Sequence, residues 1–290
     1  MIPQVVINHS KENNSLKYNI GKNTFDFNFA YVMGILNVTS DSFSDGGLFI
    51  NKEDAVRHAL KMIESGADII DIGGESTRPG SEPVSETEEL ERVIPVIDEI
   101  LDLKPEAIIS IDTTKTNVAR QALKHGALIV NDISGGTFEP NIFEVVSEFN
   151  AAMILMHIKG KPKTMQVSPE YSDVFTEVYD YLGKQSSIAT EHGIEKIIVD
   201  PGIGFGKRLE HNLSLINRLE DFKSLGFPIL IGLSRKSFIG NILNLPVEER
   251  DDATNSMNIL ALSKGARIIR THNIKQANQT CKLFNEVIIS

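Results

Sequence analysis

Polar and charged side chains follow eight short apolar runs of this 290-residue chain, each at or just after the end of the run. They are Asn37, Asp71, Asp112, Asn131, His157, Asp200, Ser234 with Arg235 and Lys236, and Arg270 with His272. Carboxylates, amides and cations of this kind can hydrogen-bond the polar edge of a ring or bind an anion. Taken singly, each has a structural explanation, since an acid such as Asp112 commonly caps the helix that follows it. As a set, they predict the lining of a pocket.

One of these residues, Asp200, opens the glycine-rich segment DPGIGFGK at 200–207. The segment is not a Walker phosphate loop, which needs GxxxxGK[ST], and it fails the dinucleotide pattern GxGxxG because Lys207 occupies the place of the third glycine. Pro201 instead fixes the backbone after Asp200, and the glycines let a ligand approach closely. Phe205 is then free to pack on a flat ring. The segment predicts an acceptor and an aromatic surface for a planar ligand.

The apolar runs themselves predict parallel β-strands, because they are short, rich in β-branched residues and not alternating. They lie near 31–38, 67–73, 107–112, 127–134, 151–158, 196–200, 228–234 and 266–272. Amphipathic helical patterns separate them. In the pattern at 85–101, Ser85 and Glu88 predict a capping box and Pro95 predicts a kink, while Asn51 predicts the start of another helix.

Three of the predicted helices end on similar short motifs. These are SGAD at 65–68, HGAL at 125–128 and KGAR at 264–267. Each glycine is expected in the left-handed conformation that ends a helix, and the next strand begins at once. The connections from helix to strand are therefore short, whereas several connections from strand to helix are long and carry the polar residues. This asymmetry places the working face at the carboxyl ends of the strands.

Eight strands alternating with eight helices predict an α/β fold, a (β/α)₈ TIM barrel, whose active site lies at the carboxyl ends of the strands. The competing open doubly wound sheet would carry GxGxxG at its first strand-to-helix turn, and this chain has none there. We expect a single domain with a short N-terminal leader. Residues 1–30 would form the leader, a hairpin that closes the bottom of the barrel, and residues 31–290 the barrel itself.

Composition limits the partners of the protein. The net charge of −10, from 29 basic and 39 acidic residues, argues against a nucleic-acid surface. The apolar runs are all far shorter than the ~18 residues that span a bilayer, and the N-terminus lacks the pattern of a signal peptide. We therefore expect a cytoplasmic protein with no membrane partner. The single cysteine, Cys281, is expected to be a buried, inert thiol.

Seven motifs, in this order along the chain, resemble those of dihydropteroate synthase, a family of pterin-binding (β/α)₈ barrels. They are MGILNVTSDSFSDGG (33–47), DIGGESTRPG (71–80), SIDTTK (110–115), NDISGG (131–136), DPGIGFGK (200–207), GLSRKSFIG (232–240) and RTHN (270–273). Members join 6-hydroxymethyl-7,8-dihydropterin pyrophosphate to p-aminobenzoate and release pyrophosphate. The resemblance implies a transferase of folate biosynthesis that uses Mg²⁺, forms a homodimer through outer helices, and is a target of sulfonamides.

The resemblance also implies roles for individual residues. The pterin ring would be held by Asp112, Asn131, Asp200 and Lys236. Pyrophosphate would be bound by Arg270, through two parallel hydrogen bonds, and by His272, with Mg²⁺ at Asn37. p-Aminobenzoate would be positioned by Thr77, Arg78, Pro79, Phe205 and Ser237. The catalytic set would be Asp112, Lys236, Arg270 and His272, which would stabilise developing charge without any side-chain nucleophile.

Three positions depart from the family pattern. Ser40 replaces the usual proline and is expected to loosen the first loop. Thr271 and Asn273 replace the usual Val and Asp of RVHD, which removes one negative charge beside the pyrophosphate site. Two other polar residues keep structural explanations: His157 a hydrogen bond in the upper core, and Arg235 an ion pair with a loop carboxylate.

Two other functions would use a similar pocket. A methyltetrahydrofolate:corrinoid methyltransferase would keep the acids and amides, but would have no use for ESTRPG at 75–80 or for a pyrophosphate clamp at Arg270 and His272. A non-catalytic pterin-binding protein would keep the pocket without turnover.

Overall fold

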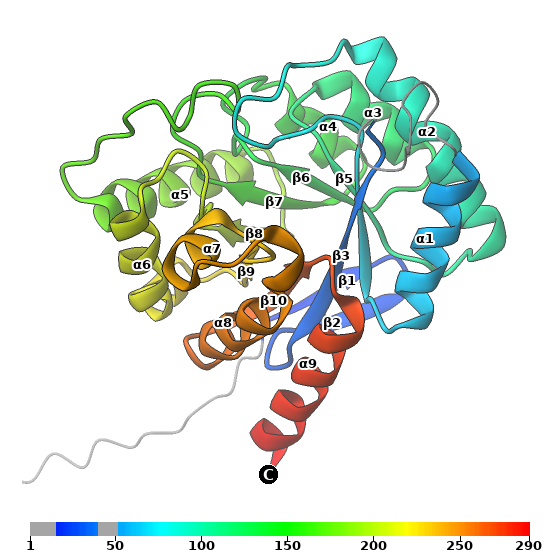
Figure 1. Ribbon diagram of the computed structural model, residues 1–290. Helices are drawn as coiled ribbons and strands as arrows, with labels where there is room; N and C mark the ends of the chain where they lie inside the picture. Colours follow the sequence, from blue (N-terminus) through cyan, green and yellow to red (C-terminus); the bar gives the residue numbers. More distant parts are fainter. Residues whose placement is uncertain (1–15, 40–51) are drawn as a thin grey trace, which may run out of the picture.

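The computed structural model describes residues 16–39 and 52–290, and its centre is a closed barrel of parallel strands (Figure 1). In order around the barrel the strands are β10 (Ala266–Thr271), β3 (Tyr31–Asn37), β4 (Ile69–Gly73), β5 (Ile109–Asp112), β6 (Ile129–Asp132), β7 (Ala152–Met156), β8 (Ile197–Asp200) and β9 (Ile229–Ile231). Parallel pairing of β9 with β10 closes the ring. Each strand lies inside one of the runs predicted from the sequence, so the predicted (β/α)₈ TIM barrel is confirmed.

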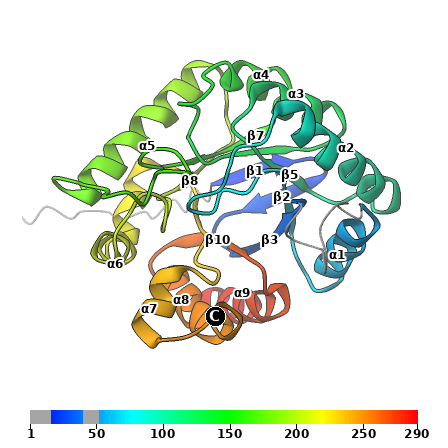
Figure 2. The same ribbon diagram turned by 45° about the horizontal axis from the view of Figure 1, so that its top comes forward.

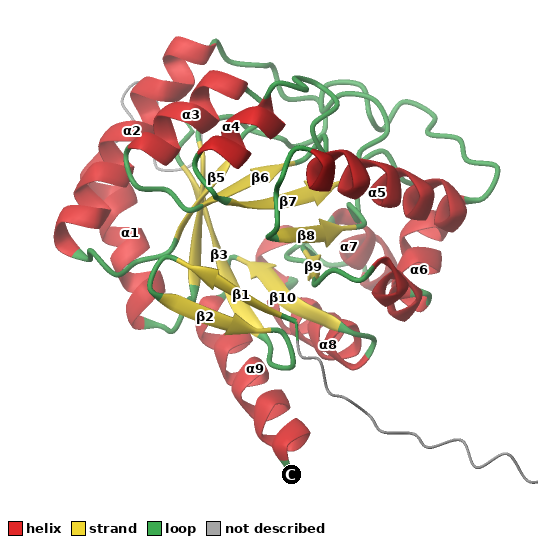
Figure 3. Cartoon of the chain, turned by 180° about the vertical axis from the view of Figure 1, so that it is seen from behind, coloured by secondary structure: helices red, strands yellow, loops and turns green. Residues whose placement is uncertain are grey.

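Helices form the outer layer of the barrel, as Figure 2 shows from above and Figure 3 from behind. They are α1 (Lys52–Glu64), α2 (Glu86–Leu103), α3 (Thr116–Lys124), α4 (Ile142–Glu148), α5 (Val174–Glu191), α6 (Leu209–Asn217), α7 (Ser237–Leu243), α8 (Asp251–Ser263) and α9 (Ile274–Ile289), with the 3₁₀ turns η1 (Leu219–Leu225) and η2 (Val247–Glu249). Gly66, Gly126 and Gly265 have φ of 94°, 100° and 103°, as predicted for the ends of α1, α3 and α8. The short helix-to-strand connections leave the long loops at the carboxyl ends of the strands.

Apolar side chains pack on both faces of the strands. On β3, Val32 and Leu36 belong to the large core between the strands and the helices. Met33 belongs to a second cluster that fills the barrel interior together with residues such as Ile69 and Ile198. Because both faces are covered, the strands have no polar face along most of their length, which explains their nearly continuous apolar sequence.

A two-stranded antiparallel hairpin, β1 (Lys17–Ile20) and β2 (Asn23–Asp26), precedes the barrel. Its buried side chains, among them Tyr18 and Phe25, pack in the same cluster as the barrel interior. The Tyr18 hydroxyl donates a hydrogen bond of 2.8 Å to the carbonyl of Ile197, the first residue of β8, so the hairpin lies at the amino ends of the strands. The division of the chain at residue 30 stays a prediction, and residues 1–15 lie outside the described part.

Helix α2 shows how local signals behave in the structure. The Ser85 hydroxyl accepts a hydrogen bond of 3.2 Å from the amide of Glu88, which is one half of the predicted capping box. The Glu88 carboxylate instead pairs with Arg92 one turn later, so the reciprocal half of the prediction was wrong. Pro95 lies within α2, which continues to Leu103. Asn51, the predicted start of another helix, lies outside the described residues. Within residues 16–39 and 52–290, no helix is long and apolar enough to cross a membrane.

Candidate active site

Side chains from four strands meet at the carboxyl end of the barrel. Arg270 on β10 donates from Nε to Asp71 Oδ2 at 2.6 Å and from Nη2 to Asp112 Oδ2 at 2.7 Å. Asn131 on β6 donates from Nδ2 to the same Asp71 oxygen at 2.9 Å. The structure therefore brings Asp112, Asn131 and Arg270 together, as the sequence analysis expected, with Asp71 of β4 as the link between them.

Asp71 was seen at a strand end in the sequence but was given no role there. Its side chain is fully buried, and its Oδ1 atom has no hydrogen-bond partner among the described residues. A buried acceptor without a protein partner is costly, so such an atom is satisfied by an ordered water or an ion, is held under strain, or takes part in function. The signal that could have found it is the acid inside the run IIDIG, where its neighbours Ile70 and Ile72 are buried.

Burial sets the charge states in this cluster. It raises the pKa of Asp112 to about 7, against the opposing effect of Arg270. It also raises the pKa of Asp200, where Lys236 and Arg270 act in the other direction. The pKa of Lys236 falls to about 8 for the same reason, although Asp200 favours its charged form. The site thus holds a carboxyl and an amine that both titrate near neutrality, a feature typical of functional sites.

The glycine loop after β8 is held from inside by Lys207. Its ammonium nitrogen donates to the carbonyls of Gly202 at 2.8 Å and Phe205 at 3.1 Å, and lies 2.9 Å from Nδ1 of His157. Both side chains are buried, which lowers the pKa of Lys207 well below its usual value and, with the charge of Lys207 acting in the same direction, the pKa of His157 to about 2. His157 therefore bonds within the upper core. In the sequence, Lys207 serves only to exclude a phosphate motif, and its structural role becomes visible only in the folded chain.

The same loop presents Asp200 and Phe205 to the pocket side. Asp200 Oδ1 accepts from the amide of Gly202 at 2.7 Å, which fixes the carboxylate in place. Gly202 has φ of 68°, and a Cβ there would lie 1.9 Å from the carbonyl oxygen of His157, so no other residue fits. Lys236 from the loop after β9 lies with Nζ 4.1 Å above the centroid of the Phe205 ring. The β8 and β9 loops thus meet at these two side chains.

His272, after β10, is tied to the loop after β9. The Ser234 hydroxyl lies 2.9 Å from His272 Nδ1 and accepts from the His272 amide at 3.2 Å. Burial, together with the nearby Arg270, lowers the pKa of His272 to about 4, so the ring is neutral at pH 7. A neutral ring that accepts at Nδ1 carries its proton on Nε2, where it can donate to a ligand.

The loop after β4 is anchored at its base. Arg92 of α2 donates from Nη1 to the Gly74 carbonyl at 2.7 Å. Lys115, before α3, forms ion pairs with Glu75 of the loop and with the buried Glu89 of α2. The base of the loop is therefore fixed to two helices of the outer layer.

The residues assigned to p-aminobenzoate are spread over three loops. Arg78 and Pro79 are exposed and Thr77 is half-buried on the β4 loop, Phe205 is half-buried, and Ser237 is exposed as the first residue of α7. Arg78 is close enough to His272 to lower its pKa. Among the described residues, neither Arg78 nor Ser237 forms a hydrogen bond or ion pair with the cluster around Asp71.

Comparison with known proteins decides the family. A family model described as pterin binding enzyme matches residues 33–272. The dihydropteroate synthase of Synechocystis is 50% identical over 91% of this chain and 92% of its own length, and that of Escherichia coli is 47% identical over 91% and 94%. The chain belongs to the dihydropteroate synthase family.

Solved structures of dihydropteroate synthases have the same fold. The Yersinia pestis enzyme with a sulfonamide drug has a TM-score of 0.88 at 38% identity, and the match covers 95% of this chain and all of that one. The Xanthomonas albilineans enzyme with 7,8-dihydropteroate has a TM-score of 0.83 at 34% identity over 94% and 98%. The same enzyme with 4-aminobenzoic acid gives 0.87 at 36% identity over 94% and 98%.

Two of the three departures from the dihydropteroate synthase pattern have a structural account. Thr271 is buried and its hydroxyl lies 3.4 Å from that of Ser234. Asn273 caps α9, since its Oδ1 accepts from the amide of Gln276 at 3.2 Å, and its Nδ2 donates to Asp251 Oδ2 at 3.2 Å. Ser40 lies outside the described residues.

The expected metal contact, Asn37, is the last residue of β3 and is half-buried. Its amide oxygen suits Mg²⁺, a hard cation that prefers oxygen, keeps several waters and needs few protein ligands. Across residues 16–39 and 52–290, no group of three His, Cys, Asp or Glu side chains could hold a metal ion. The donor set therefore fits a Mg²⁺ ion held mainly by water and substrate oxygens, with one protein ligand.

Proposed function

We propose that this chain condenses 6-hydroxymethyl-7,8-dihydropterin pyrophosphate with p-aminobenzoate, yielding 7,8-dihydropteroate and pyrophosphate. The observation that carries the proposal is the buried cluster of Asp71, Asp112 and Asn131 around Arg270, at the barrel end where such folds bind substrates. Identity of 50% to a dihydropteroate synthase over most of the chain supports the same reaction.

The pterin ring is assigned to Asp112, Asn131, Asp200 and Lys236. A pterin presents donors and acceptors along one edge, so a slot that recognises it needs carboxylate and amide partners. Asp200 has one oxygen fixed by Gly202 and the other available to accept from the ring. Phe205, below Lys236, offers an aromatic face beside this slot and is assigned to the ring of p-aminobenzoate.

The pyrophosphate is assigned to Arg270 and His272, with Mg²⁺ at Asn37. Arg270 already uses Nε and Nη2 on Asp71 and Asp112, which leaves Nη1 without a partner among the described residues. Nη1 and the second N–H of Nη2 would then be the donors for the two parallel hydrogen bonds to the pyrophosphate. His272 would donate through Nε2 without adding charge. A bound Mg²⁺ would supply positive charge beside the phosphate oxygens.

Bond breaking needs stabilisation of two opposite charges. As the C–O bond to pyrophosphate breaks, positive charge develops on the pterin and negative charge on the departing group. Asp112, when ionised, opposes the first, while Arg270 and His272 bind the second. The nitrogen of p-aminobenzoate then forms a bond to the methylene carbon and gives up one proton. No covalent intermediate with the protein is required.

p-Aminobenzoate is assigned to Thr77, Arg78, Pro79, Phe205 and Ser237. Arg78 and Ser237 are exposed donors on loops at the same end of the barrel, and neither has an ion pair with another described residue that would have to break before it binds a carboxylate. Holding the amine beside the reacting carbon makes its attack effectively unimolecular.

We also propose a homodimer that works in the cytoplasm. Large apolar side chains on α8 and α9 are exposed: Ile259 by 54%, Leu260 by 40%, Leu283 by 71% and Val287 by 73%. The two helices are neighbours in sequence and in space (Figure 1). Apolar side chains gathered on adjacent helices are typical of a protein–protein interface. Sedimentation would test this assignment, since a monomer at micromolar concentration is incompatible with it.

One assay separates this function from its alternatives. Purified protein is mixed with the pterin pyrophosphate, p-aminobenzoate and Mg²⁺, and pyrophosphate release is followed with and without p-aminobenzoate. We expect release that depends on both substrates. If pterin binds but pyrophosphate is not released, the protein is a non-catalytic pterin-binding protein or a methyltransferase of the same fold, and methyl transfer from methyltetrahydrofolate then distinguishes those two.

A further inference from the structure

Arg235 has a backbone conformation that its residue type disfavours. Its φ is 54°, in the left-handed region. The other non-glycine residues of the described ranges with positive φ are two asparagines and a serine, Asn150, Asn244 and Ser168. Asparagine adopts this conformation readily, whereas a long side chain does so only when its surroundings enforce it. Arg235 also stands between Ser234, which contacts His272, and Lys236, which lies over Phe205.

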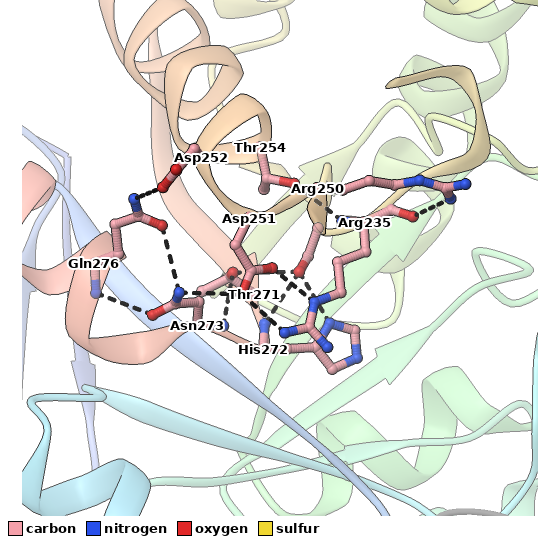
Figure 4. Close-up of polar contacts among 10 residues, drawn as sticks. Arg235, Arg250, Asp251, Asp252, Thr254, Thr271, His272, Asn273 and Gln276 are labelled. Carbon is pink, nitrogen blue, oxygen red and sulfur yellow. Dashed lines mark hydrogen bonds and ion pairs between the residues drawn. The ribbon is translucent and has the colours of Figure 1, made fainter. Parts of the chain in front are cut away.

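The start of α8 enforces this conformation at three points (Figure 4). The Arg235 amide donates to Thr254 Oγ1 at 3.1 Å, and its carbonyl accepts from Arg250 Nη1 at 3.1 Å. Its guanidinium forms two parallel hydrogen bonds to Asp251, 2.6 Å from Nε to Oδ1 and 2.8 Å from Nη2 to Oδ2. The ion pair that the sequence analysis kept as a structural explanation of Arg235 is therefore present. Two parallel bonds also fix direction, which a single contact does not.

The same carboxylate holds a second loop. Asp251 Oδ2 accepts from Asn273 Nδ2 at 3.2 Å, and Asn273 directly follows His272. Figure 4 shows Arg235 and Asn273 converging on Asp251 from opposite sides. One side chain of α8 thus joins the β9 loop, which carries Lys236, to the β10 loop, which carries His272.

We propose that Asp251 is a positioning residue that sets the spacing between Lys236 and His272. The inference rests on the proposed function, in which Lys236 binds the pterin ring and His272 the pyrophosphate of one substrate. Asp251 would touch neither part of that substrate. It acts through Arg235 and Asn273, so that the two loops present their side chains at a fixed separation.

The alternative explanation is that Asp251 only stabilises α8, because acidic residues in the first turn of a helix favour it electrostatically. The chain offers a matched control for this effect. Asp252 is the next residue, in the same first turn, and its Oδ1 accepts from Gln276 Nε2 at 3.0 Å on the surface. Asp251→Asn and Asp252→Asn remove the same charge from the same helix end, but only the first reaches the two loops.

The test compares kcat, the two KM values and Tm for both variants. We expect Asp251→Asn to lower kcat by about tenfold or more, because small misplacements of binding groups have effects of this size. Asp252→Asn should change kcat by less than about twofold. Asp251→Asn should lower Tm more than Asp252→Asn, because it also weakens an ion pair with two hydrogen bonds, so kcat is compared at a temperature where both variants are fully folded. Equal kcat values in the two variants, or a kcat loss explained by unfolded protein, would overturn the proposal.

A relocated carboxylate gives a second, independent arm. Asn273 is in direct contact with Asp251, so the double variant Asp251→Asn/Asn273→Asp returns a carboxylate to this contact, from its other side, while residue 273 still caps α9. We expect the double variant to recover most of the lost kcat. No recovery in a protein that folds with the native Tm would count against the positioning role.

A binding measurement separates this inference from the proposed function. The pterin pyrophosphate would contact both the β9 loop, through Lys236, and the β10 loop, through His272. Of these two loops, 6-hydroxymethylpterin, which lacks the diphosphate, would contact only the β9 loop. By calorimetry, Asp251→Asn should weaken the first more than the second, and this holds whether or not the wild-type protein turns over. A wild-type protein that releases no pyrophosphate would refute the function alone, and equal weakening of both ligands would refute the inference alone.

Discussion

Asp200→Asn tests the pterin pocket most directly, because it changes one atom of a side chain whose surroundings are well defined. One carboxylate oxygen accepts from the Gly202 amide at 2.7 Å, and the amide oxygen of an asparagine can keep that bond. The glycine loop should therefore hold its shape. The other oxygen, proposed to accept from the ring, becomes an NH₂ group that faces the donors of the pterin.

The expected loss has two parts. A hydrogen bond to a charged acceptor contributes about 1.5–3 kcal/mol, and leaving buried donors without a partner costs about 1–3 kcal/mol more. Together they predict a loss of about 3–5 kcal/mol in pterin binding, which corresponds to a factor between about 10² and 10⁴ in Kd. Asp200→Ala should also weaken binding strongly, but it removes the Gly202 contact as well and so tests two effects at once.

The assay is calorimetric titration with 6-hydroxymethylpterin, and the control is Asp132→Asn. Asp132 is also a buried acid at the end of a strand, β6. Among the described residues, its carboxylate accepts hydrogen bonds only from its own turn, namely from the amide and hydroxyl of Ser134 and the amide of Gly136. The control should leave pterin affinity nearly unchanged at whatever cost in stability. If Asp200→Asn weakens binding no more than the control does, Asp200 does not recognise the ring.

Three further results are expected. In steady-state assays, Arg78→Ala should raise the KM of p-aminobenzoate by about tenfold, the typical effect of losing one charge-assisted hydrogen bond. The KM of the pterin substrate should stay nearly unchanged. An equal rise in both KM values would contradict the role of Arg78. The kcat/KM of the pterin substrate should rise with pH as Asp112, with a pKa of about 7, loses its proton. It should fall again above about pH 8, where Lys236 loses its proton. If this fall at high pH persists in Lys236→Gln, the assignment of Lys236 is wrong. Measured by calorimetry, chelation of Mg²⁺ should weaken the binding of the pterin pyrophosphate by about tenfold or more, while 6-hydroxymethylpterin binds as before. If the pterin pyrophosphate binds equally well with and without Mg²⁺, a metal contact in binding is excluded.

The barrel and the identity of most rim residues could be predicted because parallel strands repeat one local pattern. Asp112 and Asp200 are each the last residue of a buried strand, and in a parallel barrel all such residues lie at the same end. That rule needs no knowledge of distant contacts. It therefore worked for every strand whose end is marked by a change from apolar to polar residues.

This rule does not identify functional or structural side chains that lie within a strand or in the loop beyond its end. Asp71 lies two residues inside the end of β4, and its partner Arg270 is 199 residues away, so the contact depends on the register of the closed barrel. Lys207 points inward only because the glycines before it adopt positive φ. Asp251 looks like an ordinary acid at a helix start until Arg235 and Asn273 are seen to meet it.

The charge balance of the pocket explains why an acidic protein can bind an anionic substrate and why a metal ion would still matter. Asp71, Asp112 and Asp200 face Arg270 and Lys236, and Lys207, whose own pKa is well below its usual value, also acts on Asp200. Arg270 is shared between two of the carboxylates and Lys236 sits near its titration point.

His272, the other donor proposed for the pyrophosphate, is neutral at pH 7 because burial and Arg270 lower its pKa to about 4. The described side chains thus position a diphosphate without fully neutralising it. The same balance suits the pterin end, since an excess of carboxylate stabilises the positive charge that develops there as the diphosphate departs.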